Sequence, residues 1–140
     1  DLVGIQARVL RELGSRHVMI VHGEDGLDEI TLSGYTSIAE LKDGAIREYR
    51  IDPADFGIAH APLAALRADS AEQSKTMLLA VLDGQSGPTR DIVLLNAAAA
   101  IYTAGITASL ADGVALARSV IDSGAARAKL DALVQLSQSL

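Results

Sequence analysis

The chain has 140 residues, a net charge of −6, 49% hydrophobic residues and no cysteine. This length suits one domain with its own core, and the absence of cysteine excludes disulfides and zinc–thiolate sites. The acidic balance, with lysines and arginines scattered singly, argues against nucleic acid as a partner, and no apolar run approaches the roughly 20 residues that span a membrane.

The first predicted elements are a helix and a strand. Apolar residues recur at helical spacing over residues 3–13 and stop at Gly14, a typical residue beyond a helix end. Residues 17–21 are apolar and β-branched, which predicts a short buried strand. A helix followed by a buried strand is half of an α/β repeat, so the loop after residue 21 is expected at a ligand-binding edge of the sheet.

The next segment predicts the rest of the sheet. Residues 30–33 are interpreted as a possible short strand. Residues 37–42 and 45–51 flank Asp43-Gly44, a dipeptide that favours a hairpin turn because both of its residues tolerate positive φ. After this hairpin, Phe56 is predicted to anchor the chain against the core.

The second half is predicted to be helical. Ser70 and Ser109 are good N-caps, and Pro88 suits a first helical turn. The predicted helices are a short one at 61–66 and longer ones at 71–82, 88–104, 110–123 and 125–137. The fold class is therefore α/β, with a mixed sheet containing a β-hairpin, followed by a helical carboxyl-terminal half in one domain.

The segment 21–30 is the most unusual part of the sequence. It holds four carboxylates, one histidine and two glycines directly after the predicted strand. An acidic loop at a strand end supplies the oxygen ligands that Mg²⁺ prefers, although a solvated acidic turn explains the composition equally well. Within it, Asp25 is expected to accept a bond from the backbone near Leu27 in an Asx-turn.

Asp28 and Glu29 are the candidate metal ligands. Neighbours on a regular strand point to opposite faces, so both reach one site only from an irregular loop or from opposite sides of a metal–substrate complex. Two carboxylates alone bind Mg²⁺ weakly, and such sites commonly borrow substrate phosphates. A metal role therefore predicts a polyphosphate-type substrate; the alternative is that both residues only solvate a turn.

Other residues carry weaker signals. His22 could transfer a proton, but a lone histidine at a strand end is more often structural. The histidines form no HxxxH pattern, and no nucleophile elbow, P-loop or GxGxxG motif is present. Asn96 lies in an apolar helix and must find a hydrogen-bond partner if buried, so a structural role is predicted. No catalytic or cofactor-binding residue is predicted.

Five sequence blocks together resemble the anthranilate phosphoribosyltransferase family. They are HGEDGLDE at 22–29, AELKDG at 39–44, IDPADFG at 51–57, VLLNAAAA at 93–100 and IDSGAA at 121–126. They run in order through essentially the whole chain. No block is specific alone, but the combination is.

The resemblance implies a nucleoside phosphorylase/phosphoribosyltransferase-like catalytic domain. It implies Mg²⁺-dependent transfer of phosphoribosyl from phosphoribosyl pyrophosphate to anthranilate, with release of pyrophosphate, in tryptophan biosynthesis. In that family the matching acidic pair binds Mg²⁺, which makes Asp28 and Glu29 the metal ligands, with Glu29 expected to touch both ions. A homodimer in the cytoplasm is also implied, with no nucleic acid or membrane as partner.

The resemblance covers only part of such an enzyme. Residues 1–140 correspond to the carboxyl-terminal portion of the α/β catalytic domain, without the amino-terminal helical domain, the phosphate loop or the dimer-forming helices. This segment alone is therefore expected to be an inactive part of a glycosyltransferase. Three alternatives remain at this point. The first is a pyrimidine nucleoside phosphorylase-like enzyme or another phosphoribosyltransferase of the same fold, the second is a non-catalytic nucleic-acid-binding relative, and the third is a purely structural module.

Overall fold

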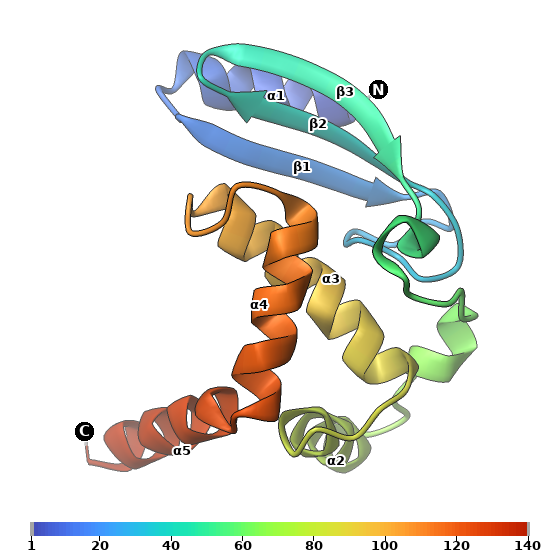
Figure 1. The fold of residues 1–140 in the computed structure, drawn as a ribbon, viewed down its shortest axis with the longest axis vertical. Coiled ribbons are helices and arrows are strands. Elements are labelled where there is room, and N and C mark those ends of the chain that lie inside the picture. The colour runs from blue at the N-terminus through green and yellow to red at the C-terminus, as the bar shows by residue number, and fades with distance from the viewer. Residues whose placement is uncertain (1, 140) are drawn as a thin grey trace.

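The computed structural model describes residues 2–139, which form a three-stranded sheet at one end and a helical assembly below it (Figure 1). The sheet part contains helix α1 (Leu2–Glu12) and strands β1 (His17–Gly23), β2 (Thr36–Lys42) and β3 (Ala45–Ile51). The helical part contains two 3₁₀ turns, η1 (Pro53–Phe56) and η2 (Leu63–Leu66), and helices α2 (Ala71–Leu82), α3 (Pro88–Thr103), α4 (Leu110–Asp122) and α5 (Ala125–Gln138). The predicted α/β class, with a hairpin followed by helices, is confirmed.

The hairpin between β2 and β3 forms where the sequence predicts it. Asp43 and Gly44 have φ of +50° and +80°, so the turn uses the left-handed conformations that this dipeptide tolerates. The strand order is β1-β2-β3, and both pairs are antiparallel. The described strands thus do not make the mixed sheet that was predicted, because consecutive strands without a crossover helix between them pair antiparallel.

Two strand predictions need correction. Strand β1 is half-exposed rather than buried, because over residues 2–139 it pairs on one edge only, with β2. Residues 30–33 form no strand, although Ile30, Thr31 and Leu32 are buried. No neighbouring strand binds this backbone: the Thr31 N–H donates to Thr36 Oγ1 at 3.1 Å, and the Leu32 carbonyl accepts from the N–H of Ala61 at 3.0 Å.

The helix starts follow the sequence signals. The N–H of Gln73 donates to Ser70 Oγ and that of Asp112 donates to Ser109 Oγ, both at 3.1 Å. Each serine thereby satisfies one of the N–H groups that a helix leaves free at its start. Segment 61–66 makes only the 3₁₀ turn η2. No helix among residues 2–139 is long and apolar enough to cross a membrane.

Helix α3 is the centre of the core, which explains why residues 92–103 carry no charge. Leu95 and Ala98 pack into a cluster with the sheet and the segment after β1, and Phe56 borders this cluster as predicted. Leu94, on another side of the helix, packs into a second cluster with α2 and α4. At the start of α3 the buried Arg90 donates to the Asp122 carboxylate at 2.5 Å, which fixes α3 to the end of α4.

The crossing of α3 and α4 depends on Gly113. A Cβ atom built there would lie 2.7 Å from the carbonyl oxygen of Ala98, which is backbone and cannot move aside cheaply. We expect Gly113→Ala to lower the free energy of unfolding by about 1–3 kcal/mol, because overpacking outweighs the better helix propensity of alanine. Urea unfolding measures this, with Gly34→Ala as the control, since a Cβ at Gly34 meets nothing within 4 Å. Equal stability of the two variants would contradict the prediction.

Candidate metal site

The acidic loop begins where β1 ends, at Gly23, and lies at one end of the sheet beside η1 (Figure 1). The N–H of Gly23 donates to the carbonyl of Leu27 at 2.9 Å, and the N–H of Gly26 donates to the carbonyl of Gly23 at 2.9 Å. A Cβ at position 23 would lie 2.6 Å from Asp25 Oδ1 and 3.0 Å from Thr31 Cβ. Glycine at this position therefore permits the tight turn.

Asp25 holds the loop together through hydrogen bonds from three of its residues. Its carboxylate accepts bonds from the Leu27 N–H at 3.1 Å, from Thr31 Oγ1 at 2.6 Å and from the Ser33 hydroxyl. Burial raises the pKa of Asp25, but the bonds from Ser33, Thr31 and Leu27 outweigh that effect and hold the pKa below its ordinary value. The predicted Asx-turn is confirmed. The oxygens of this carboxylate are engaged in hydrogen bonds within the loop.

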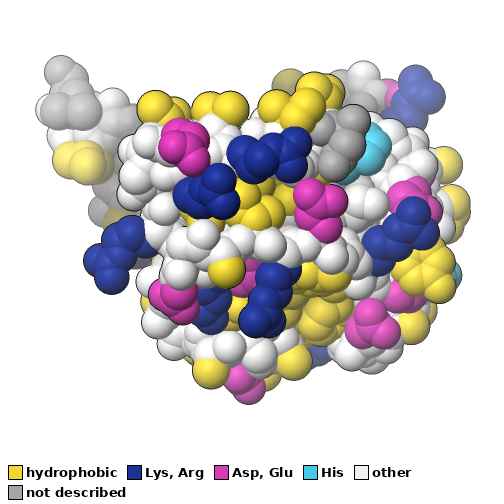
Figure 2. Space-filling view, turned by 90° about the horizontal axis from the view of Figure 1, so that it is seen from above, with side chains coloured by type: hydrophobic (Ala, Val, Ile, Leu, Met, Phe, Trp, Pro, Cys, Tyr) yellow, Lys and Arg dark blue, Asp and Glu magenta, His cyan; other side chains and the backbone are white. Residues whose placement is uncertain are grey.

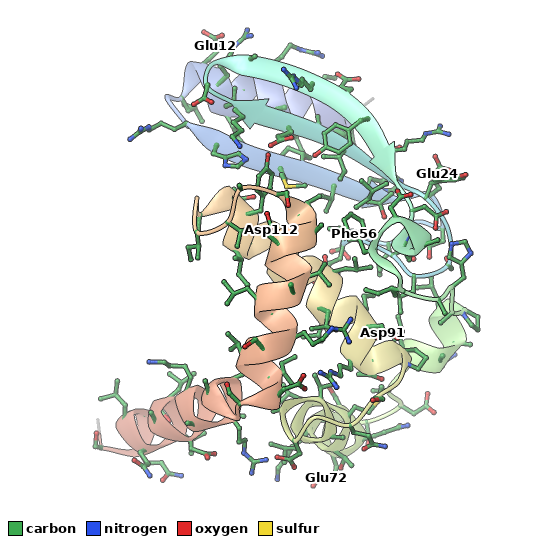
Figure 3. All side chains as sticks on the ribbon, viewed as in Figure 1. Glu12, Glu24, Phe56, Glu72, Asp91 and Asp112 are labelled. Atoms are coloured by element: carbon green, nitrogen blue, oxygen red, sulfur yellow. The ribbon has the colours of Figure 1, made fainter. Side chains whose placement is uncertain are left out.

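Glu24 also has partners within the described part of the chain. Its carboxylate pairs with Arg50 of β3 at 3.0 Å, and its N–H donates to the carbonyl of Tyr35 at 3.0 Å. Figure 3 labels Glu24 at this end of the sheet. It therefore ties the start of the loop to the sheet.

Asp28 and Glu29 are the two carboxylates that the loop leaves free. Both are exposed, and neither has a hydrogen bond or ion pair to any residue between 2 and 139. The backbone around them is fixed, because Leu27 accepts the bond from Gly23, and Ile30 is bound by the Asn96 side chain of α3 at 2.9 Å. The pair thus stands on a short arch with a hydrogen-bonded residue on each side.

The chemistry of this pair fits Mg²⁺ shared with a ligand. Carboxylate oxygens are hard donors, and Mg²⁺ characteristically keeps several waters or substrate oxygens beside one or two protein carboxylates. Nowhere in residues 2–139 do three or more His, Cys, Asp or Glu side chains gather in a way that could hold a metal by themselves. The arrangement therefore favours a site completed by phosphate oxygens over an all-protein cage.

The histidines do not join this site. His22 is exposed and has no hydrogen-bond partner within residues 2–139. No described side chain is therefore placed to exchange a proton with it. His17 bonds Glu40 at 3.0 Å and His60 bonds Asp52 at 2.7 Å. The partners in these contacts are 23 and 8 residues apart in the sequence, so no short motif marks them.

A second polar cluster surrounds Glu40, which is buried in the centre of β2. Its carboxylate accepts bonds from His17 at 3.0 Å, Tyr49 at 3.0 Å and Tyr102 at 2.7 Å. Burial raises the pKa of Glu40, but the bonds from Tyr102, His17 and Tyr49 together outweigh it and lower the pKa below its ordinary value. Lys42 donates to Tyr102 at 3.1 Å, so the cluster joins the hairpin to α3.

The outer surface above the sheet carries mixed charge. Figure 2 shows lysine and arginine side chains interleaved with aspartate and glutamate, with apolar side chains between them. This face has no large area of one sign.

Comparison with known proteins identifies the family of the chain. The sequence model of the glycosyl transferase family, a/b domain, matches residues 1–127. The chain belongs to this glycosyl transferase family. The match includes the acidic loop and strands β1, β2 and β3, so these are parts of the family's a/b domain.

Three relatives of the chain are anthranilate phosphoribosyltransferases. Anthranilate phosphoribosyltransferase of Chromobacterium violaceum is 65% identical over 140 residues, which is 100% of this chain and 41% of that protein. The crystal structure of anthranilate phosphoribosyltransferase from Thermus thermophilus has a TM-score of 0.86 at 38% identity, covering 95% of this chain and 39% of that one. A serine-to-alanine variant of the Saccharomyces cerevisiae enzyme, with Mg bound, has a TM-score of 0.83 at 25% identity, covering 97% and 39%. This chain thus spans about two fifths of the length of these relatives.

Proposed function

We propose that this chain is part of an anthranilate phosphoribosyltransferase. The reaction is the Mg²⁺-dependent transfer of phosphoribosyl from phosphoribosyl pyrophosphate to anthranilate, with release of pyrophosphate, in tryptophan biosynthesis. The observation that carries the proposal is the pair of free carboxylates, Asp28 and Glu29, held on a fixed arch in a chain 65% identical to an enzyme of that name. The Mg bound to the yeast relative supports the choice of metal.

The residues of the loop have separable roles in this reaction. Asp28 and Glu29 would hold Mg²⁺, which supplies stabilisation of the negative charge that develops on the departing pyrophosphate. Asp25 keeps the loop in shape and takes no part in metal binding, because its oxygens are engaged by Leu27, Thr31 and Ser33. The weakly basic aromatic amine of anthranilate needs mainly alignment beside the sugar.

The rest of the active site is proposed to lie outside this chain. Residues 1–140 serve as the carboxyl-terminal portion of the catalytic domain, and a helical domain, a phosphate loop and a dimer-forming segment complete a cytoplasmic homodimer. The share of the relatives that this chain spans, 41% of the Chromobacterium violaceum enzyme, supports this division.

A chimera tests the proposed function. Residues 1–140 replace the aligned part of the Chromobacterium violaceum enzyme, and loss of anthranilate fluorescence is followed with phosphoribosyl pyrophosphate present. We expect turnover that stops when EDTA removes Mg²⁺ and returns when Mg²⁺ is restored, and no turnover by the chain alone. Turnover of a pyrimidine nucleoside with phosphate, or a shift of nucleic acid in a gel at low salt, with no use of anthranilate, would contradict the proposal.

A further inference from the structure

The side chain of Asn96 makes three hydrogen bonds between α3 and the acidic loop. Its Oδ1 accepts from the Ile30 N–H at 2.9 Å, and its Nδ2 donates to the carbonyls of Ile30 and Ile92, each at 3.0 Å. The orientation of the amide is set by its partners, because one partner is a donor and the other two are acceptors. Asn96 therefore binds both the N–H and the carbonyl of Ile30, in addition to a carbonyl of its own helix.

These bonds fix the backbone next to the metal ligands. The Ile30 N–H belongs to the peptide that joins Glu29 to Ile30, so its bond to Asn96 holds the plane of that peptide. The following peptide is held as well, by the bond to the Ile30 carbonyl and by the bond from the Thr31 N–H to Thr36 Oγ1. On the other side, the Gly23 N–H holds the carbonyl of Leu27. Only the peptide between Asp28 and Glu29 lacks such a bond among those described.

The helix that carries Asn96 is itself rigidly placed. Leu94 and Leu95, its neighbours on α3, are 0% and 2% exposed and belong to the two core clusters. A side chain anchored in this helix can transmit that fixed position to the loop, while Asp28 and Glu29 stay exposed. Pre-set ligand positions raise metal affinity, because less backbone freedom is lost on binding.

We infer that Asn96 is a positioning residue that sets the metal affinity of the Asp28–Glu29 pair. The inference rests on the proposed metal role of that pair and adds the element that holds it in place. Removing the amide leaves both carboxylates present but frees the Glu29–Ile30 peptide to rotate. Residues that orient metal ligands typically change affinity by about 10- to 100-fold when they are replaced. We expect a loss of about tenfold, near the lower end, because the Leu27 side of the arch remains held.

The test is a Mn²⁺ titration of the chimera with pyrophosphate at a fixed concentration, with free Mn²⁺ read from its solution EPR signal and the Mn²⁺ bound by pyrophosphate alone subtracted. Asn96→Leu removes all three bonds at similar volume, and Asn96→Ala provides a second variant with a different packing change. The control is Val81→Ala, which weakens the second core cluster but touches nothing in the loop. All proteins are compared at a temperature where circular dichroism shows them fully folded. We expect the dissociation constant to rise about tenfold in both Asn96 variants and to stay unchanged in Val81→Ala.

The outcomes separate this inference from the proposed function. Unchanged Mn²⁺ affinity in the folded Asn96 variants, or an equal loss in Val81→Ala, overturns the positioning role while leaving the metal role of the acidic pair intact. Asp28→Asn/Glu29→Gln is titrated beside them. If that double variant binds Mn²⁺ as well as the unmodified chimera, the metal role itself fails, and the inference about Asn96 fails with it.

Discussion

Asp28→Asn/Glu29→Gln is expected to reduce phosphoribosyl transfer by the chimera by at least about 100-fold, the scale on which removal of a charge-stabilising group acts. Both substitutions keep the size of the side chain and remove only its charge. Because neither carboxylate has a partner among residues 2–139, the midpoint of thermal unfolding is expected to stay the same. Turnover of anthranilate and thermal unfolding, measured on the same preparation, check both parts of this result.

The matched control lies in the same loop. Glu24→Gln also removes one exposed carboxylate, but that group pairs with Arg50 at 3.0 Å instead of standing free. An exposed pair of this kind contributes less than about 1 kcal/mol, so both activity and stability should change little. Equal activity losses in Glu24→Gln and in the double variant would show a general need for negative charge, and would contradict a specific role for Asp28 and Glu29.

Glu40→Ala is expected to cause the largest loss of stability, about 2–4 kcal/mol at neutral pH. The substitution leaves His17, Tyr49 and Tyr102 without the acceptor that all three share, in a part of the sheet that is largely buried. It also removes the bond from Tyr102 of α3 to the hairpin and leaves the bond from Lys42 to Tyr102 in place. Urea unfolding at pH 7 measures the difference, and Glu48→Ala, an exposed glutamate on β3, is the control.

The effect of Glu40→Ala should depend on pH in one direction. The pKa of Glu40 is lowered in the folded protein from an ordinary value of 4.5, so the ionised form is favoured by folding. Its contribution is therefore complete above pH 4.5 and is lost as the pH falls through the lower, folded-state pKa. The stability difference between the unmodified chain and Glu40→Ala should shrink on acidification. A difference that stays constant from pH 7 to acid would show that packing, not charge, is what Glu40 supplies.

Local signals in the sequence predicted most of the elements. Asp43-Gly44 permits the hairpin turn because both of its residues take positive φ, and Ser70 and Ser109 cap their helices through bonds that span three residues. Asp25 binds Leu27 only two residues away. Each of these interactions is completed within a short stretch, so the residue types alone are informative.

Interactions between distant residues were not predictable in the same way. Asn96 and Ile30 are 66 positions apart, and Glu40 and Tyr102 are 62 apart, so neither pair has a pattern that marks it. The strand predicted at residues 30–33 was wrong for a similar reason. Its apolar residues indicate burial, but its backbone bonds go to the side chains of Asn96 and Thr36 and to the backbone of Ala61 instead of a neighbouring strand. Antiparallel pairing of β1 likewise depends on the path of the loop that follows it.

The candidate site was only partly accessible from the sequence. The acidic loop was predicted as a metal site because carboxylate oxygens are ligands that Mg²⁺ prefers. The resemblance to the family then indicated Asp28 and Glu29 as the metal ligands within that loop. The structure adds that the loop itself occupies Asp25 and that Arg50 occupies Glu24, which distinguishes these carboxylates from the free pair. The binding of Mg²⁺ by Asp28 and Glu29 stays a prediction.

The most direct test is crystallographic. Crystals of the chimera are soaked in Mn²⁺ and pyrophosphate, and anomalous difference maps are calculated for the unmodified protein and for Asp28→Asn/Glu29→Gln. We expect at least one anomalous peak bonded to a carboxylate oxygen of Asp28 or Glu29, with pyrophosphate oxygens completing its coordination, and no such peak in the double variant. Metal and pyrophosphate bound with no ligand from Asp28 or Glu29 would contradict the account of this loop.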